Sequence, residues 1–284
     1  LLLILGANCT LYGLESLFSP DSNTTVPVSF ISFDLLSNTT TSLMTWTYES
    51  GTYIIGSAFD IDNQIYYFSY VTVYPQKTLL SAINVATLEF IFQGLDFSNG
   101  AVVDWDFDID SNSNLHFVSR TRHSICHHQM CLIDVNMWNS HTRKSSIVIQ
   151  AFTGIPVLSS LAYDEKDNTT IIASHGSVKF GKDMVYTLND DYFVSVYPSA
   201  FDVSIQGSIT WNRYQSKGYL IQLTSSNDFR IVEYAPNTNQ YPIVCNLETP
   251  DSLVYRYSLT DVTAMDNENN ILAAAMNRVH NTSL

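Results

Sequence analysis

A pattern that recurs about every fifty residues limits what this chain can fold into. Each copy has a small or apolar residue, an aromatic residue or Met, then Asp or Asn, a short polar turn and an alternating apolar run. Five copies are anchored on Phe59, Phe107, Tyr163, Trp211 and Met265, which lie 48, 56, 48 and 54 residues apart. A near-constant period of this length is typical of proteins in which copies of one supersecondary unit stack on each other.

The second copy shows what one repeat contains. Val, Ile, Tyr, Phe and Thr dominate its apolar runs, as half-buried strands prefer. The runs predict four strands at residues 52–59, 65–74, 78–85 and 88–93. No segment carries a sustained apolar stripe at helical spacing, so we expect few helices. Four antiparallel strands per repeat, repeated five or six times around an axis, predict an all-β fold, the β-propeller.

Two stretches of the second repeat, FDIDNQIYYFSY and TLLSAINVATLEF, resemble blades of the YVTN-like and NHL-type propeller repeats. The resemblance covers most of the chain and implies a propeller with degenerate repeats. It assigns no functional residues to this sequence.

The period predicts one propeller domain over residues 1–284. Its repeats span residues 1–50, 51–100, 101–153, 154–200 and 201–251, and a half-blade follows at 252–284. Two closures are open. The last strands complete the first blade within one chain, or the half-blade accepts a strand from another subunit. The second closure is a head-to-tail contact, and such contacts build filaments unless the rotation closes.

The apolar run LLLIL at Leu1–Leu5 is too short to span a bilayer. Between a signal-peptide remnant and a buried strand, Leu1–Ala7 favours the strand, because strands rich in Leu and Ile need burial on both faces.

Charge excludes two classes of partner. The chain carries 13 basic and 27 acidic residues, a formal net charge of −14. Such a surface repels phosphate backbones and anionic lipids, so we expect neither nucleic acid nor a membrane as partner.

Charged residues make up only 14% of the chain, and Ser, Thr, Asn and Tyr supply much of its polarity. This balance is typical of extracellular β-proteins and predicts a secreted or cell-surface location. N-x-[ST] sequons support it as expected glycosylation sites. The sequons lie at Asn8, Asn23, Asn38, Asn168 and Asn281.

The stretch RHSICHHQMC at residues 122–131 concentrates Cys and His. Strand alternation with the loop HHQM sets Cys126 opposite Cys131. Opposite residues of an antiparallel pair lie about 4.5–5.5 Å apart, within disulfide range. We therefore predict a disulfide worth roughly 2 kcal/mol that stiffens a hairpin tip.

The alternative for this stretch is a zinc site that adds His123, His127 or His128 to the two cysteines. The Cys-x4-Cys spacing is looser than the usual zinc knuckle, and an oxidising compartment favours the disulfide. We predict no metal here. Cys9 and Cys245 lie in the first and fifth repeats, where three states stay open: a bridge that locks the ring, two buried thiols, or a bridge between subunits.

Acidic residues recur after the anchor positions. Turn capping by Asp and Asn explains the recurrence better than a calcium-binding ring, because every blade needs a turn whereas a calcium site is needed once. The recurring residues are Asp60, Asp108, Asp164, Asn212 and Asp266.

One strand of the third repeat carries acids at every second position, Asp104, Asp106 and Asp108 among them. They share a face, and strands near a propeller axis line its channel, so this row is the candidate for an acidic channel wall. Solvated strand acids are the alternative.

No nucleophile elbow, H-E-x-x-H motif, P-loop or dinucleotide motif occurs in the sequence. The sequence therefore predicts a non-enzymatic extracellular glycoprotein without a cofactor. Its expected partners are further copies of itself, as in a filament, or another extracellular protein or glycan. The alternatives are a carbohydrate-active hydrolase or lyase that uses channel acids, and a sugar-binding lectin.

Overall fold

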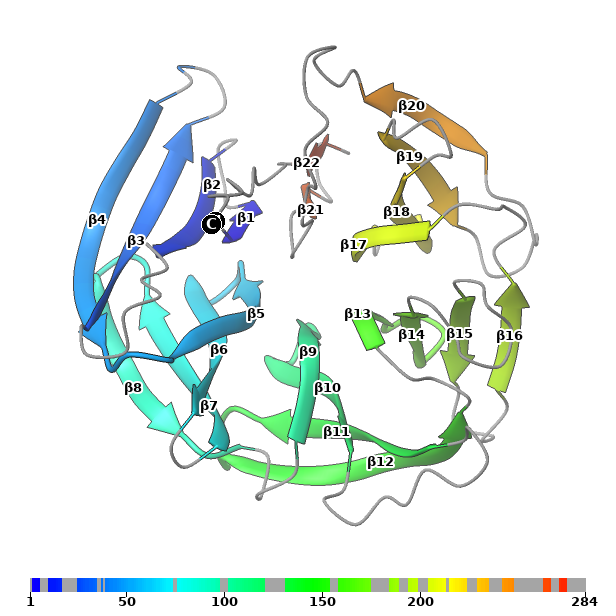
Figure 1. Ribbon diagram of the computed structural model, residues 1–284, viewed down its shortest axis with the longest axis horizontal. Helices are drawn as coiled ribbons and strands as arrows, with labels where there is room; N and C mark the ends of the chain where they lie inside the picture. The colour runs from blue at the N-terminus through cyan, green and yellow to red at the C-terminus, as the bar shows by residue number, and fades with distance from the viewer. Residues whose placement is uncertain are drawn as a thin grey trace, which may run out of the picture. The chain divides into compact units, whose positions relative to one another are not determined.

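Every regular element in the described part of the chain is a β-strand (Figure 1). The computed structural model describes residues 2–5, 10–16, 25–34, 37, 39–73, 76–97, 102–120, 131–153, 158–174, 184–188, 194–198, 204–212, 215–223, 229–234, 242–247, 263–266 and 271–274. The chain divides into two compact units. Unit 1 comprises Leu1–Ile125 and Leu132–Gln150, and unit 2 comprises Cys126–Cys131 and Ala151–Leu284.

Unit 1 holds three four-stranded antiparallel sheets, each a simple meander in chain order. The first sheet comprises β1 (Leu2–Leu5), β2 (Thr10–Ser16), β3 (Val26–Asp34) and β4 (Thr39–Tyr48). The second comprises β5 (Tyr53–Asp60), β6 (Ile65–Val73), β7 (Gln76–Asn84) and β8 (Glu89–Leu95). The third comprises β9 (Val102–Ile109), β10 (Asn114–Arg120), β11 (Cys131–Asn139) and β12 (Lys144–Thr153). The first strands of successive sheets, β1, β5 and β9, lie next to each other (Figure 1).

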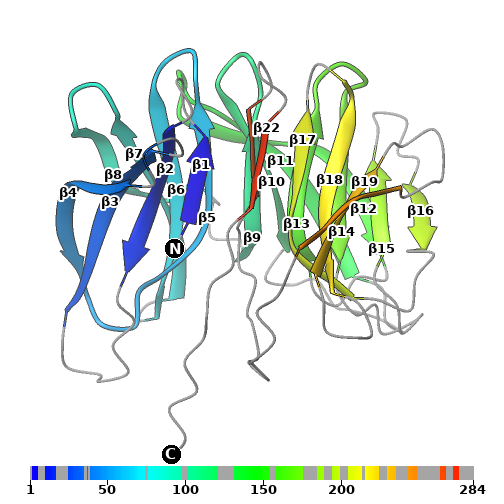
Figure 2. The ribbon, with the colours of Figure 1, turned by 90° about the horizontal axis from the view of Figure 1, so that it is seen from above.

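Unit 2 holds two further four-stranded sheets and one two-stranded sheet of described residues. The fourth sheet comprises β13 (Leu158–Asp164), β14 (Thr169–Ser174), β15 (Met184–Leu188) and β16 (Val194–Pro198). The fifth comprises β17 (Ser204–Asn212), β18 (Lys217–Leu223), β19 (Phe229–Tyr234) and β20 (Ile243–Leu247). The last pairs β21 (Thr263–Asp266) with β22 (Ile271–Ala274). Within this unit β17 contacts both β13, which lies beside it in Figure 2, and β21.

The strand pattern expected for the second repeat is confirmed: β5–β8 begin and end within two residues of the predicted bounds. The run at the chain start also forms a strand, because β1 pairs with β2 from Leu2↔Leu14 to Leu5↔Leu11.

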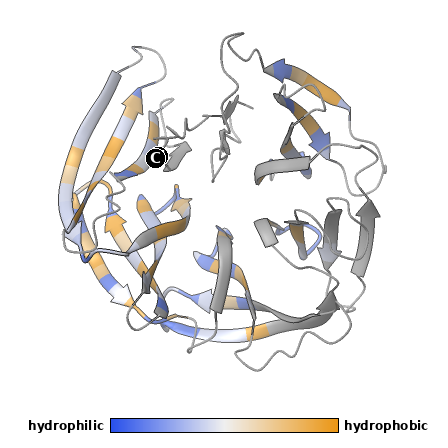
Figure 3. Ribbon diagram, viewed as in Figure 1, coloured by the Kyte–Doolittle hydropathy of each residue, from blue (hydrophilic) through white to orange (hydrophobic). Residues whose placement is uncertain are grey.

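Alternation along the strands builds the cores. In β6, Tyr66, Phe68 and Tyr70 pack against the first sheet, while Tyr67 on the opposite face packs toward the third. Successive residues of a strand point to opposite faces, so a sheet covered on both sides needs a nearly continuous apolar run. In β3, by contrast, hydrophobic and hydrophilic residues alternate (Figure 3), and buried residues alternate with more exposed ones at the start of the strand.

Aromatic rings fill much of these interfaces. Between the first and second sheets, Phe30 and Tyr66 have ring centroids 5.0 Å apart, and Tyr48 and Tyr70 have centroids 4.5 Å apart. Between the second and third sheets, Trp138 is fully buried against Tyr67 and Phe92. In unit 2 the core between the fourth and fifth sheets centres on Trp211 and Tyr234.

Candidate functional site

The recurring acids and amides close tight turns. Each lies at the end of the first strand of a sheet or directly after it, and accepts a hydrogen bond from a backbone N–H in the turn that follows. The bonds run from Asn63 N to Asp60 Oδ1 (3.0 Å), Asn112 N to Asp110 Oδ1 (2.9 Å), Lys166 N to Asp164 Oδ1 (3.2 Å) and Gln215 N to Asn212 Oδ1 (3.0 Å). Such self-capping turns are what Asp and Asn supply best.

The third repeat corrects one predicted residue. The turn acid there is Asp110 rather than Asp108, because Leu115 pairs with Ile109 and the turn starts after that pair. Asp108 lies two residues earlier, opposite His116 within the ladder, and its carboxylate accepts a bond from the N–H of Ile109 (2.8 Å).

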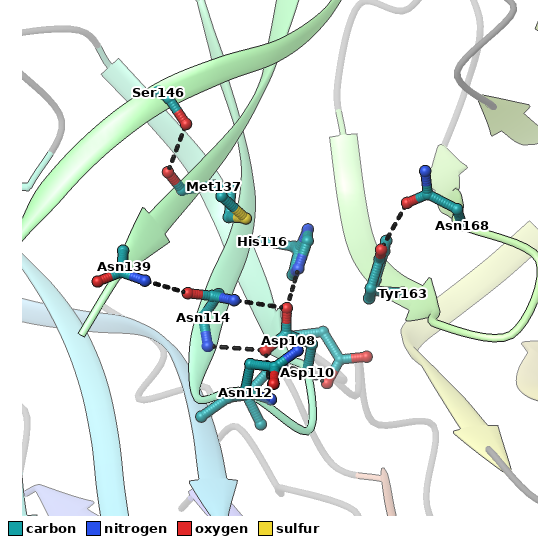
Figure 4. Close-up of polar contacts among 11 residues, drawn as sticks. Asp108, Asp110, Asn112, Asn114, His116, Met137, Asn139, Ser146, Tyr163 and Asn168 are labelled. Carbon is teal, nitrogen blue, oxygen red and sulfur yellow. Dashed lines mark hydrogen bonds and ion pairs between the residues drawn. The ribbon is translucent and has the colours of Figure 1, made fainter. Parts of the chain in front are cut away.

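Asp110 anchors a buried polar network (Figure 4). Its Oδ1 accepts bonds from the N–H groups of Asn112 and Asn114. Its Oδ2 accepts from Asn114 Nδ2 (2.9 Å) and lies 3.1 Å from His116 Nε2. Asn139 Nδ2 in turn donates to Asn114 Oδ1 (2.8 Å), which links β10 to β11.

Electrostatics agree with this geometry. Burial alone would raise the pKa of Asp110, but the hydrogen bonds from His116 and Asn114 outweigh it and hold this pKa below its usual range. Asp164, the corresponding acid of the fourth sheet, shows the opposite result: burial, followed by the charge of Asp167, raises its pKa. The turn acids therefore share a position but not an electrostatic environment.

A second network joins two sheets. Asn63 Nδ2 donates to Asp60 Oδ2 and lies 2.9 Å from Ser113 Oγ, and the Ser113 hydroxyl also donates to Asp60 Oδ2. Asp60 ends β5, whereas Ser113 lies in the turn between β9 and β10. Both side chains are buried.

These networks occupy the carboxylates that a calcium ion would need. Four donors surround the carboxylate of Asp110 and three surround that of Asp60, all from the protein itself. Within the described ranges, no group of three His, Cys, Asp or Glu side chains is arranged to hold a metal ion. The side chains of these turn residues cap the backbone N–H groups of their own turns.

The predicted acidic channel wall falls on β9. Asp108 is half-buried, while the side chains of Asp104 and Asp106 lie outside the described part of the structure. The channel assignment therefore stays a prediction.

The predicted Cys126–Cys131 disulfide also lies largely outside the described residues. Cys131 begins β11, and residues 121–130 are not described. The observed ladder sets Arg120 opposite Ile133, whereas a regular ladder with the two cysteines opposite would set it opposite Met137. The disulfide stays a prediction, and it requires a register change before Cys126.

The other cysteines are partly described. Cys245 lies on β20 and is exposed and free, while Cys9 lies outside the described residues. Among the sequons, only Asn168 is described. It is exposed in the turn between β13 and β14, and its Oδ1 accepts a bond from the Tyr163 hydroxyl (2.6 Å; Figure 4). The sequons outside the described ranges are Asn8, Asn23, Asn38 and Asn281.

The sequence did not point to the exposed edge of the fifth sheet. Its last strand, β20, carries Ile243 and Val244 with 51% and 52% of their surfaces exposed. Next to this sheet in unit 2, the two-stranded sheet β21–β22 contacts β17 through β21. An apolar run such as IVC resembles a core strand in the sequence, so only the three-dimensional neighbours reveal its exposure. These strand edges are the candidate binding surface.

Comparison with known proteins places the fold. No model of a protein family matches the chain, and no curated protein matches it. The chain is similar to an oligogalacturonate lyase solved in complex with manganese, at 14% identity and a TM-score of 0.55, over 88% of this chain and 66% of that one. An oligogalacturonate lyase from Vibrio parahaemolyticus gives 12% identity and a TM-score of 0.56, over 96% and 80% of the two chains.

TolB from Acinetobacter baumannii is a further similar structure, at 14% identity and a TM-score of 0.50, over 94% of this chain and 63% of that one. The chain thus spans about two thirds of the lyase solved with manganese and of TolB. These are propeller proteins, and at such identities the similarity shows the fold alone. This protein is an all-β propeller built of antiparallel sheets.

Among the described residues there is no helix with the length and apolar character that a membrane crossing requires.

Proposed function

We propose that this chain is a secreted or cell-surface glycoprotein with a non-enzymatic binding and structural role, which assembles with copies of itself by strand addition. We further propose the blade count of five or six that the repeat predicts, in which β21–β22 belongs to the half-blade at residues 252–284. The observation that carries the proposal is this two-stranded sheet, which lies against the four-stranded fifth sheet in unit 2.

Strand edges that have no ladder partner among the described residues would supply the driving force. In the described part of the chain, β22 has a ladder partner, β21, on one side. Unpaired N–H and C=O groups along an edge are a template for another strand, and natural proteins cover such edges when they stay monomeric. A strand supplied by a partner adds backbone hydrogen bonds and side-chain burial together.

Composition and turn chemistry support the extracellular, non-enzymatic part. The chain combines a net charge of −14 with few charged residues, and its described sequon, Asn168, is exposed in a turn. The buried acids Asp60 and Asp110 are committed to turn capping by their own hydrogen bonds.

The head-to-tail version of assembly requires β1 to move between copies, because β1 pairs with β2 of its own chain in the structure. The double variant Leu5→Cys/Leu11→Cys tests this, since these residues are ladder partners and opposite residues lie within disulfide reach. The native cysteines are replaced by Ser. Electron microscopy should show filaments in the reduced protein and isolated particles once the new disulfide forms.

A matched lock elsewhere serves as control. Val71→Cys/Thr78→Cys joins β6 to β7, which are also ladder partners but take no part in the exchange. Filaments should persist with this lock in both redox states. Isolated particles from the reduced Leu5→Cys/Leu11→Cys protein at every concentration tested would rule out the head-to-tail assembly.

A second candidate is a lyase acting on acidic oligosaccharides, suggested by the two oligogalacturonate lyases among the similar structures. Its proposed catalysts are the acids of β9. Turnover of oligogalacturonate to an unsaturated product, lost in Asp106→Asn and Asp108→Asn, would favour this candidate. No turnover, or turnover unchanged in both variants, would count against these residues as catalysts.

A further inference from the structure

Strand β20 exposes apolar side chains on both of its faces. Residues 242–246 are all exposed, and the neighbouring Ile243 and Val244 are each about half exposed. The β19–β20 register shifts at Val244, because Val232 pairs with Ile243 and its neighbour Ile231 pairs with Cys245. Paired residues share a face and adjacent residues of β19 point to opposite faces, so Ile243 and Cys245 lie on opposite faces of the sheet, and a partner surface laid against one face would cover only one of the two. Pairing along the edge brings flanking side chains beside both faces.

The other outer strands whose side chains are described carry hydroxyl or charged residues, although Ile91 of β8 and Ile147 of β12 are also exposed. The exposed positions of β4 are mostly hydroxyls, with Thr39, Thr40, Thr41 and Ser42 in sequence. Strand β8 carries Glu89 at its start, and β12 carries Lys144. Charged and polar residues of this kind discourage edge-to-edge pairing. The segment PIVCNL at residues 242–247 has no charged residue.

We propose that β20 is a self-association edge, along which a second copy of this chain pairs its own β20 in antiparallel orientation about a two-fold axis. Charge argues for this occupant. A basic partner would bind to the acidic surface of this chain, which has a net charge of −14, rather than to an uncharged strand. Two identical acidic chains repel each other over that surface, so an uncharged strip such as residues 242–247 is where two copies can meet. An isologous contact lets each edge satisfy the open backbone groups of the other.

The two-fold axis determines which residues of the two β20 strands face each other. Full overlap of two antiparallel β20 strands places the axis at the central residue of Ile243–Leu247, which sets Cys245 opposite Cys245 of the second copy. Opposite Cα atoms in such a pair lie about 4.5–5.5 Å apart, within the range that a disulfide spans. The exposed, free thiol therefore reports on the contact.

Oxidative trapping tests the proposal. In a chain whose only cysteine is Cys245, oxidised glutathione takes two electrons and two protons from the two thiols. One intermolecular disulfide and two molecules of glutathione result. Non-reducing electrophoresis should show a rapidly trapped dimer that reduction dissolves. Val244→Lys should slow trapping by about tenfold or more, because it puts a charge on the pairing edge.

Ile147 provides the matched control. It is 55% exposed on β12, the outer strand of the third sheet. In a chain whose only cysteine comes from Ile147→Cys, trapping should be slow, and Ile147→Lys should leave trapping through Cys245 unchanged. Equal trapping rates for the two single-cysteine chains, or a Val244→Lys variant that traps at the original rate while retaining the wild-type melting temperature, would overturn the proposal.

A non-covalent measurement completes the test. The Cys245→Ser protein should form a dimer in analytical ultracentrifugation, and added salt should strengthen it, because salt screens the repulsion between two acidic chains. A dimer weakened by salt, or no dimer, would contradict an uncharged edge contact. The disulfide lock between β1 and β2 does not involve β20, so these dimers should still form in the locked protein. The experiment therefore distinguishes failure of the β20 contact from failure of the strand exchange in the proposed function.

Discussion

The hydroxyl of Ser113 donates a hydrogen bond to the carboxylate of Asp60, although fifty-three positions separate them and they belong to different sheets of unit 1. Asn63 bridges the same pair through its side-chain amide. The contact ties the first turn of one sheet to the first turn of the next, at a place where both side chains are buried.

Ser113→Ala should destabilise the protein by about 1–3 kcal/mol, because it leaves a buried carboxylate with one donor fewer. Ser216→Ala is the matched control: Ser216 ends the corresponding turn of the fifth sheet at a similar positive φ, and its hydroxyl has no hydrogen-bond partner among the described residues. Urea unfolding of both variants isolates the bond. Equal losses would mean that the bond to Asp60 contributes nothing measurable.

Acid should weaken the protein through Asp110. Its pKa is lowered in the folded state, so it adds stability above its unfolded pKa, about 3.9, and this contribution disappears as the pH falls through the lower folded value. Asp110→Asn should therefore cost more stability near neutrality than in acid. Chemical denaturation of wild type and variant across this range measures the difference.

Asp164→Asn should show the reverse trend. The raised pKa of Asp164 means that its contribution is present below the unfolded pKa and lost as the pH rises through the folded value. The free energy of unfolding of Asp164→Asn, relative to that of wild type, should therefore be higher near neutrality than in acid. Parallel pH profiles for the two variants would refute the opposite environments assigned to the two turns.

Gly94→Ala should cost about 1–2 kcal/mol, because Gly94 has a positive φ that L residues adopt at that cost. An added Cβ would also lie 3.1 Å from the Tyr70 hydroxyl. In a Tyr70→Phe background the hydroxyl is gone and only the backbone strain remains, so the penalty should shrink without vanishing. A penalty as large in the Phe background would locate all of the strain in the backbone.

Alkaline pH should weaken the protein through Tyr67. Burial, with a smaller effect from the charge of Asp60, raises the pKa of Tyr67 to about 12. Its contribution is complete below the unfolded pKa, about 10, and is lost as the pH rises toward the folded value. Tyr67→Phe should flatten the fall of the unfolding free energy above that pH. An unchanged slope would show that Tyr67 ionises equally easily in both states.

Local pattern sufficed to predict much of the fold. The strands β5–β8 were placed within two residues because alternating β-branched and aromatic runs, separated by polar turns, carry their own boundaries. The prediction that Asp108 closes the turn of the third repeat is wrong. Acids occupy every second position of this strand, so the sequence offers several equivalent residues at which the turn could start. Only the pairing of Leu115 with Ile109 selects one.

The candidate site depended on information that local pattern does not hold. His116 is a single histidine in an apolar strand, and nothing in the sequence connects it to Asp110, six residues away across a turn. The exposure of Ile243 and Val244 depends on which strands lie beside the fifth sheet. Long-range neighbours decide both cases.

Among the described residues, six turns end on a residue other than glycine with a φ between 46° and 60°, namely Gln64, Leu88, Ser113, Arg143, Asn168 and Ser216. A left-handed residue with a side chain costs roughly 1 kcal/mol relative to glycine there. Distant sites add nearly independently. Most of these side chains make contacts that glycine would remove, but the Ser216 hydroxyl has no hydrogen-bond partner among the described residues, so Ser216→Gly is a route to a more heat-resistant form that leaves every described strand unaltered.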